Sequence, residues 1–512
     1  MRKNLIISIL LALNAFFFTI QAATADKNRP NVVVIYANDM GKGLLSAYGQ
    51  KHFTTPHIDA LVHNGVSFNY AFGGSVSANA RASLLTGYHD CNKQKWRMGR
   101  GGVYMREDTV DIHEQENFIN DNSILLPEND LYLPQVFGKA GYVTVQIGML
   151  GMGNTSTRKQ MFQHGWNYFY GYLDHTRSQG YYPTFLFEND RIEMIEGNTR
   201  IDCGRGFVYE TEQEMIRNDR WNMEGKKVYS PNLFIEKTLD LIREFKDRPF
   251  FLVYSTPLPG PVSIPAIHPE VANSEELTQI EKEFASMMKL LDDHVGVIMS
   301  ELRTLGLEEN TIVVVASDNG HDVCYLQENR IDRPFRNMKT GEAFDNSYSK
   351  YYSDKAGDIF NGNMGMAGLK RSNLNGGIHI PLIFYWKDGL KKRVCEEVVS
   401  GYDILPTMAG LLGIKLETRK DGISFLPALT KGRKLPADRF VTVSSYEGPA
   451  IIVNNGWKLR YLVQQKKYEL YNIRKDPEEK YDVILRFPGK AEELKKLLTE
   501  QCGGNIENGI IY

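Results

Sequence analysis

Two clusters of polar residues in this chain have the types that cation chemistry requires. Asn38-Asp39 follows one run of β-branched residues, and Ser317-Asp318-Asn319-Gly320-His321 follows another. Carboxylate and amide oxygens that meet at one place are the ligands that a hard divalent cation such as Ca²⁺ or Mg²⁺ prefers. Asp and Asn are also common turn and helix-capping residues, so either cluster alone favours a simple turn. The two together favour a cation site.

A third cluster places a hydroxyl group four residues before a guanidinium group. Ser77 and Arg81 share one face of a helix if that helix begins near Ser77. A helix N-terminus beside an arginine attracts a tetrahedral oxyanion, and Ser77 would be the nucleophile or its precursor. The alternative, which is the commoner arrangement, is a capping serine with a solvent-facing arginine.

The elements that must position these clusters follow from the apolar pattern. Short strand-like runs at 32–36, 141–145, 250–254, 312–315 and 381–384 alternate with helical stretches, among them a long amphipathic helix within 275–305. This order predicts an α/β fold with a doubly wound, mostly parallel sheet and helices on both faces. Ligands of such sheets bind beyond the carboxyl ends of the strands, where both cation clusters lie.

The rest of the chain divides by composition. The α/β domain is predicted over residues 28–430, with a long polar and aromatic insertion loop at about 326–366. Residues 437–512 are predicted to form a small α+β subdomain, with strands at 440–443, 450–453 and 457–461 and a helix at 491–498.

The N-terminus and the charge balance bound the location and the partners. Leu5–Phe18 is apolar, follows Arg2 and Lys3, and precedes the small residues 22–25, which is typical of a signal peptide over residues 1–25. The run is too short to span a bilayer, so we expect an exported protein, periplasmic or secreted, of bacterial type.

With 60 basic and 62 acidic residues and a net charge of −2, nucleic-acid binding is excluded. Five scattered cysteines leave one disulfide possible.

Several ordered motifs resemble the sulfatase family of the alkaline-phosphatase-like superfamily over nearly the whole mature chain. The residues that carry the resemblance are Asn38-Asp39-Met40-Gly41, Thr55-Pro56-His57-Ile58-Asp59, Ser77 to Gly87, Ser317-Asp318-Asn319-Gly320, Lys370 to Pro381, Phe169 to Leu173 and Tyr181-Tyr182-Pro183. The last two segments are similar to a secreted bacterial arylsulfatase-type branch.

The resemblance implies a mechanism and a site. A maturation enzyme would oxidise Ser77 to formylglycine, whose hydrate attacks sulfur and ejects the alcohol. A divalent cation, most simply Ca²⁺ with Mg²⁺ as the alternative, would be held by Asn38, Asp39, Asp318 and Asn319. Arg81 and Lys370 would contact the sulfate.

The chain also departs from the family pattern at four positions. Asn38 stands in place of an aspartate, and Asn79 in place of the proline or alanine that the maturation enzyme normally meets. Met149 stands in place of a lysine that bridges nucleophile and sulfate in the family, and Leu258 in place of a histidine that serves as an acid or a sulfate ligand; these losses argue against full activity. His321 and His175 are alternative substrate-binding donors, although each is more commonly a packed or solvated histidine.

Three hypotheses for the function follow. The leading one is a sulfuric ester hydrolase that acts on a sulfated glycan or an aryl sulfate. Its aromatic residues either stack on sugars or pack in the core; they are Phe169, Tyr170, Tyr172, Tyr181 and Tyr182. The second is a glycan-binding protein that keeps the fold but not hydrolysis, and the third is phosphoester chemistry by unmodified Ser77.

Overall fold

A ten-stranded mixed sheet forms the centre of the protein. The computed structural model describes residues 29–91, 130–150, 158–173, 177–189, 191–199, 223–260, 262–322, 331–332, 336–337 and 358–511. The strand order is β12-β2-β11-β8-β1-β7-β3-β4-β5-β6. The strands are β1 (Asn31–Asn38), β2 (Val66–Phe72), β3 (Val143–Met149), β4 (Tyr168–Tyr172), β5 (Phe185–Glu188), β6 (Arg191–Met194), β7 (Phe250–Pro259), β8 (Thr311–Ser317), β11 (Leu382–Tyr385) and β12 (Arg393–Ser400).

The central strands of this sheet are parallel. Strand β1 pairs in parallel with β7 on one side and β8 on the other, and β3 continues the parallel array to β4. Antiparallel pairing enters at β11, between β8 and β2, and at β5 and β6. The predicted mostly parallel sheet is therefore confirmed, and β1 lies at its middle.

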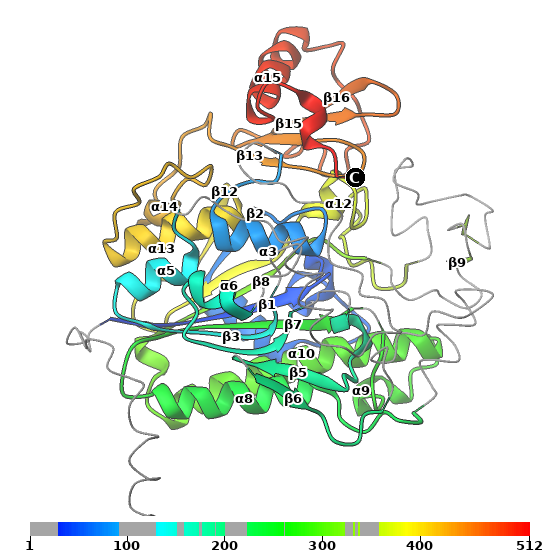
Figure 1. The fold of residues 1–512 in the computed structure, drawn as a ribbon. Helices are drawn as coiled ribbons and strands as arrows, with labels where there is room; N and C mark the ends of the chain where they lie inside the picture. Colours follow the sequence, from blue (N-terminus) through cyan, green and yellow to red (C-terminus); the bar gives the residue numbers. More distant parts are fainter. Residues whose placement is uncertain are drawn as a thin grey trace, which may run out of the picture.

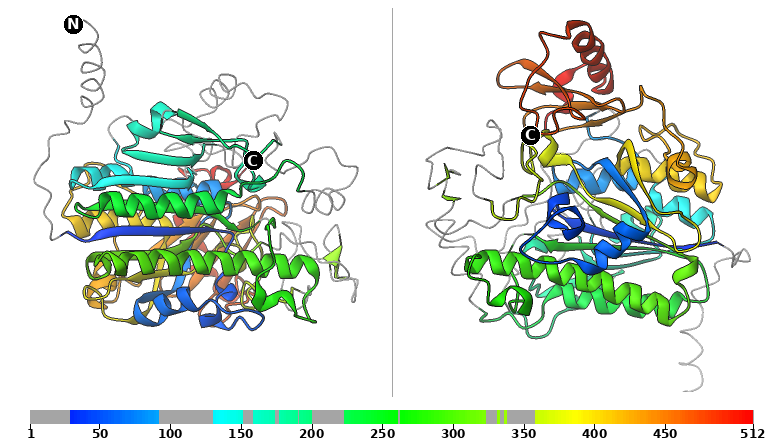
Figure 2. Two further views of the ribbon diagram at one scale, coloured as in Figure 1. Left: turned by 90° about the horizontal axis from the view of Figure 1, so that it is seen from below. Right: turned by 180° about the vertical axis from the view of Figure 1, so that it is seen from behind.

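Helices cover both faces of the sheet (Figures 1 and 2). The helices are α2 (Pro56–Asn64), α3 (Ser77–Thr86), α5 (Leu133–Lys139), α6 (Arg158–Gln163), α8 (Ser230–Phe245), α9 (Pro269–Ala272), α10 (Gln279–Thr304), α12 (Asn375–Ile378), α13 (Ile404–Leu412), α14 (Leu426–Lys431) and α15 (Pro488–Gln501). Residues of β1 alternate between two cores: Val33 and Ile35 pack with helices α2, α8 and α10, while Val32 and Val34 pack with α3, α5, α13 and α14. The doubly wound architecture is confirmed.

The long helix α10 forms where the apolar stripe predicts it, within 275–305. Thr278 and Glu281 form a capping box that fixes its start at Gln279. Its apolar stripe is buried, and its Asp292 carboxylate accepts the backbone N–H groups of His57 and Ile58 at 3.2 and 2.8 Å. Helix α10 therefore caps the N-terminus of α2 as well as covering the sheet.

Several boundaries differ from the sequence-based expectation. The strand expected at 141–145 begins only at Val143, because Gly141 adopts a left-handed φ of 85° that ends the preceding turn. Strands β2, β4, β5, β6 and β12 are additional to those the apolar runs indicated. The interrupted burial of β12 and its bulge between Cys395 and Val398 explain why its pattern is weak.

The C-terminal part forms a separate four-stranded antiparallel sheet with one helix on it (Figure 1). Its strands are β13 (Phe440–Val443), β14 (Ala450–Val453), β15 (Trp457–Leu462) and β16 (Lys467–Asn472), and α15 packs against β14 and β15. The predicted α+β subdomain is confirmed as a fold. Its domain limits stay predictions. Val441 and Ile452 pack with Phe72 and Val398, which anchors this sheet to strands β2 and β12.

Two predicted segments lie wholly or largely outside the described residues. The signal peptide over 1–25 is one of them. The insertion loop at 326–366 is represented by the strand pair β9 (Ile331–Asp332) and β10 (Arg336–Asn337) and by residues from 358 onward. Among the helices that the structure describes, we find none with the length and apolar character of a membrane span.

Candidate active site

The two predicted cation clusters meet at the carboxyl ends of β1 and β8. Ala37 and Ser317 are register partners on these parallel strands, so the residues that follow them are neighbours. The Asp39 N–H donates to Asp318 Oδ1 at 2.9 Å, and Asn319 Nδ2 donates to Asp39 Oδ1 at 2.9 Å. Asp39 holds a left-handed φ of 59°, which an aspartate tolerates. The carboxylates thus share one small site, as the sequence predicts.

Ser77 begins helix α3 and points into the same site. Its hydroxyl lies 3.2 Å from Asp39 Oδ1 and 3.1 Å from Asn319 Oδ1, and the residue is 2 % exposed. Every residue of α3 is buried, including the polar ones. Ser77 is therefore a buried serine at a helix N-terminus, within hydrogen-bond distance of two of the predicted cation ligands.

Arg81 lies one turn after Ser77 and is also buried. Its Nη2 donates to Asp318 Oδ2 at 3.0 Å and lies 3.4 Å from Asn38 Oδ1, while Nη1 donates to Ser255. The guanidinium also lies over the Tyr36 ring, 5.1 Å from its centroid. The alternative of a solvent-facing arginine is therefore wrong.

Lys370 completes the group of charges. Its Nζ donates to both Asp39 oxygens at 2.6 and 2.7 Å, so Lys370 and Ser77 share Asp39 Oδ1. The lysine comes from a segment that docks beside α3, because Arg371 N–H donates to the Ser75 carbonyl at 2.7 Å. A lysine far along the chain thus reaches the helix that begins at Ser77.

The charges of these residues depend on one another. Burial acts to raise the pKa of Asp39, but the Lys370 ammonium and the Asn319 hydrogen bond outweigh it and lower that pKa. Burial raises the pKa of Asp318, which Arg81 opposes. Burial acts to lower the pKa of Lys370, but the Asp39 carboxylate outweighs it and raises that pKa. The lysine is therefore held as a cation beside Ser77.

The donor set fits a hard divalent cation and an anion. Asn38, Asp39, Asp318 and Asn319 offer carboxylate and amide oxygens, and all four residues are at most 4 % exposed. The Nε of Arg81 is a buried donor for which the described residues supply no hydrogen-bond partner. A buried guanidinium donor of this kind suits an anionic oxygen of a ligand.

Two residues of this site were missed by the sequence analysis. Ser255 on β7 holds the Arg81 guanidinium, and Tyr36 on β1 lies beneath it. The parallel register makes Tyr36 and Ser255 neighbours. Only the pairing of β1 with β7 could have identified these two residues, and the sequence pattern does not encode that strand order.

The two histidines have different outcomes. His175 lies outside the described residues. His321 is fully buried; its Nε2 lies 3.7 Å from Asp358 Oδ2 and its ring lies 5.6 Å from that of Phe284. Gly41 and Gly362 pack so closely on it that a Cβ at either position would approach His321 atoms within 2.7 Å. The role of His321 toward substrate stays a prediction.

Of the two interpretations left open for the five aromatic residues, the structure favours packing in the core. Phe169, Tyr170, Tyr172, Tyr181 and Tyr182 are at most 4 % exposed. Tyr181 stacks on Tyr229, and Tyr170 and Tyr172 pack edge-on against Phe234 of α8. Side chains this deeply buried present no face to a sugar.

The four departures from the family pattern have distinct surroundings. Met149 and Leu258 are 1 % and 0 % exposed, and Leu258 belongs to the apolar core on the α10 side. Asn79 is buried, and its amide donates to Asp90 Oδ2 at 3.0 Å. Asn38 donates to the Gly260 carbonyl and keeps Oδ1 directed to Arg81.

A second group of possible metal ligands lies at the start of α2. Ligand atoms of His57, Asp292 and Asp293 lie within 4.8 Å of one another. Burial raises the pKa of Asp292 to about 6, and its carboxylate already accepts the two backbone N–H groups at the start of α2. We interpret this group as a helix cap.

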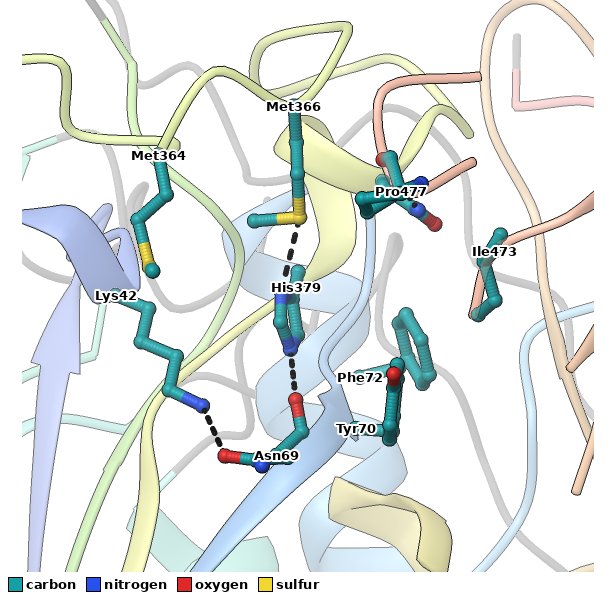
Figure 3. A pocket seen from close by; sticks show the side chains of 10 residues that line it. Lys42, Asn69, Tyr70, Phe72, Met364, Met366, His379, Ile473 and Pro477 are labelled. Atoms are coloured by element: carbon teal, nitrogen blue, oxygen red, sulfur yellow. Dashed lines mark hydrogen bonds between the residues drawn. The ribbon is translucent and has the colours of Figure 1, made fainter. Parts of the chain in front are cut away.

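A separate cavity of about 300 Å³ lies where strand β2, helix α12 and the segment after β16 meet (Figure 3). Lys42, Asn69, His379 and two methionines, Met364 and Met366, line it together with apolar and aromatic residues. The imidazole of His379 lies between the Asn69 carbonyl, at 2.5 Å, and the Met366 sulfur, at 3.1 Å. The loops around this cavity lie next to those of the Ser77 site. The residues that line the cavity include neither Ser77 nor its charged partners.

Buried histidines predict a fold that is sensitive to acid. Burial lowers the pKa of His379 and of His294, which contacts the Tyr254 hydroxyl at 2.7 Å, from 6.5 to about 3. Because the folded-state pKa is the lower one, the unfolded chain takes up the proton first, and stability is lost as the pH falls from 6.5 toward 3. Each histidine is expected to cost roughly 2 to 3 kcal/mol by pH 4.5.

Denaturant unfolding between pH 7 and 4.5 measures this loss. His294→Gln is expected to reduce the slope of the unfolding free energy against pH by the equivalent of about one proton. The same change at the exposed His63 serves as the control. An unchanged slope in His294→Gln contradicts the assignment.

The class of protein follows from the sheet and from the place of the site on it. A mainly parallel sheet with a C-terminal antiparallel subdomain, and with its oxygen-rich site beyond the strand ends, is the alkaline-phosphatase-like α/β fold. The chain belongs to the sulfatase family, because the family model described as Sulfatase matches residues 30–414, well over half of the chain.

Curated relatives agree with this family along nearly the whole chain. The N-acetylgalactosamine-6-O-sulfatase of Bacteroides thetaiotaomicron is 24% identical over 536 residues, which cover 92% of this chain and 93% of the relative. Human arylsulfatase A is 24% identical over 544 residues, which cover 96% of this chain and 89% of the relative.

Solved structures agree with the fold. One solved structure, from a study of glycosaminoglycan metabolism by Bacteroides thetaiotaomicron, matches with a TM-score of 0.68 at 19% identity. The match covers 93% of this chain and 100% of that chain. Ps i-CgsB in complex with k-i-k-neocarrahexaose matches with a TM-score of 0.67 at 20% identity, covering 94% and 95%. At these identities the match concerns the fold.

Proposed function

We propose that this chain is an exported sulfuric ester hydrolase that removes sulfate from a sulfated carbohydrate, with aryl sulfates as the alternative substrate, through a formylglycine made from Ser77. The observation that carries the proposal is the shared oxygen of Asp39, which receives both the Ser77 hydroxyl and the Lys370 ammonium. The relatives named for N-acetylgalactosamine 6-sulfate chemistry support the carbohydrate as substrate class.

The residues of the site have complementary tasks in this reaction. Arg81 and Lys370 supply fixed positive charge where the sulfate oxygens bind, and their burial strengthens that interaction. Asp39 and Asn319 hold the side chain of residue 77 in one orientation. When present, the formylglycine supplies the oxygen nucleophile as its hydrate. Ser255 and Tyr36 keep the Arg81 guanidinium in place.

A divalent cation, Ca²⁺ or Mg²⁺, fits the oxygen donors of Asn38, Asp39, Asp318 and Asn319. When bound, it polarises sulfate oxygens. Asn38 lacks the negative charge of an aspartate, so the donor set carries two carboxylates. With Met149 and Leu258 apolar and buried, we propose that Arg81 and Lys370 carry the recognition of sulfate.

Release of sulfate tests the proposed function directly. Protein purified from its native host is incubated with 6-sulfated N-acetylgalactosamine, other sulfated sugars, an aryl sulfate and an aryl phosphate, and the inorganic anion is measured by ion chromatography. We expect sulfate from at least one sulfate ester. Binding of a sulfated sugar with no release favours the glycan-binding hypothesis, and release of phosphate alone favours phosphoester chemistry by unmodified Ser77.

A divalent cation added to the metal-free protein is expected to bind at the Ser77 site and to stabilise the folded state. A ligand at one hundred times its dissociation constant adds about 2.7 kcal/mol to the stability of the folded state, so the melting temperature should rise by a few degrees. Asp39→Asn should weaken this response, because it removes one of the two carboxylates.

The matched control is Asp293→Asn, which alters the group at the start of α2 instead. Its response to Ca²⁺ and Mg²⁺ should equal that of the unchanged protein. A response that disappears in Asp293→Asn and persists in Asp39→Asn would move the cation to α2 and contradict the assignment.

A further inference from the structure

The segment that follows the nucleophile helix is docked onto the C-terminal subdomain. His89 Nε2 lies 3.2 Å from Gln501 Oε1 at the end of α15, and the Ser444 N–H donates to Asp90 Oδ1 at 2.9 Å. Residues separated by more than 350 positions are therefore in contact. Cys91 follows Asp90 directly, and Cys502 follows Gln501 directly.

The two cysteines lie in the same apolar cluster. Both are 0 % exposed, and both pack with residues of β14, β15, β16 and α15. Burial raises the pKa of the Cys91 thiol, and a side-chain hydrogen bond with the Cys502 thiol raises it further. The Cys502 sulfur is also packed closely against Gly509, since a Cβ at that position would lie 3.1 Å from it. Both free thiols therefore lie in one buried cluster, close enough to influence each other.

We propose that Cys91 and Cys502 form a disulfide that ties the segment after helix α3 to the C-terminal helix α15. The inference uses the export proposed above, because disulfides persist in oxidising compartments. Two S–H bonds break and one S–S bond forms. The oxidant is a disulfide of a thiol–disulfide oxidoreductase or of a small thiol, and it is reduced to two thiols. The bond forms during folding, before the apolar cluster closes over both sulfurs.

The disulfide would hold the active site through a short chain of contacts. Asp90, next to Cys91, accepts hydrogen bonds from Ser444 of the subdomain and from Asn79 of α3 at 3.0 Å. Asn79 lies two residues after Ser77, in the first turn of α3. Fixing Cys91 therefore fixes the position of the turn that carries Ser77.

Peptide mapping of the unchanged, exported protein tests the pairing without any variant. The protein is denatured without reductant, alkylated and digested. We expect one cross-linked species whose mass is the sum of the Cys91 and Cys502 peptides less two hydrogens, and its separation into two peptides after reduction. Alkylation of both cysteines before reduction, or a bridge from either one to another cysteine, would overturn the proposal.

Thermal unfolding of variants tests its effect. Cys91→Ala and Cys502→Ala should each lower the melting temperature by about 3 °C or more, and the double variant should fall no further than the lower single variant. Cys395→Ala removes a different buried cysteine and serves as the control for the cavity that each change creates. Additive losses in the double variant would contradict the bond.

Discussion

Ser77→Ala is expected to reduce sulfate release by about a thousandfold or more, the loss typical when an enzyme nucleophile is removed. The reason is that alanine leaves no oxygen to become the nucleophile at the point where Asp39 and Asn319 converge. The structure should change little, because Ser77 is small and its backbone begins the helix. Initial rates of sulfate release on the preferred substrate measure the effect.

The control is Ser83→Ala on the same helix. Ser83 is buried at 8 % exposure and lies almost two turns from Ser77. We expect it to keep most of the activity, with a comparable melting temperature for both variants. Equal activity of Ser77→Ala and the unchanged protein would remove Ser77 from the mechanism.

Lys370→Met is expected to lower kcat/KM by a factor of about 100 to 1,000, which corresponds to roughly 3 to 4 kcal/mol of lost transition-state stabilisation. Methionine is unbranched like lysine and only one atom shorter, but it carries no charge, so the sulfate and Asp39 both lose their ammonium partner. The pKa of Asp39, which the ammonium now lowers against burial, should rise as well.

Two further variants separate charge from folding. Lys370→Arg keeps the positive charge and should retain part of the activity, while Lys387→Met removes an exposed lysine that pairs with Glu309 on the surface. Lys387→Met should change neither rate nor stability appreciably. If Lys370→Met keeps the full kcat/KM, Lys370 has no role in binding sulfate.

The meeting of the two oxygen-rich clusters could be predicted from the sequence. Asp39 and Asp318 each follow a continuous apolar run, and the carboxyl ends of parallel strands lie on one edge of a sheet. The neighbourhood of Ser77 and Arg81 followed from their spacing of four on a helix. These parts of the site are encoded locally, in strands and one helical turn.

Other parts of the site depend on contacts that sequence patterns do not contain. Lys370 was expected only through the resemblance to the family, because it follows β8 by more than 50 residues. Ser255 was missed because its closeness to Arg81 requires β7 to lie beside β1. The aromatic residues of β4 were open to two interpretations, since tyrosines suit both sugar sites and cores. Burial by α8 decided for the core.

The intact mass of the peptide that contains residue 77, taken from the native host, shows whether this residue acts as a formylglycine. We expect a peptide lighter than the serine form by two hydrogens, in a fraction that follows the specific activity of the preparation. A peptide that contains only unmodified Ser77, in protein that releases sulfate, would contradict it.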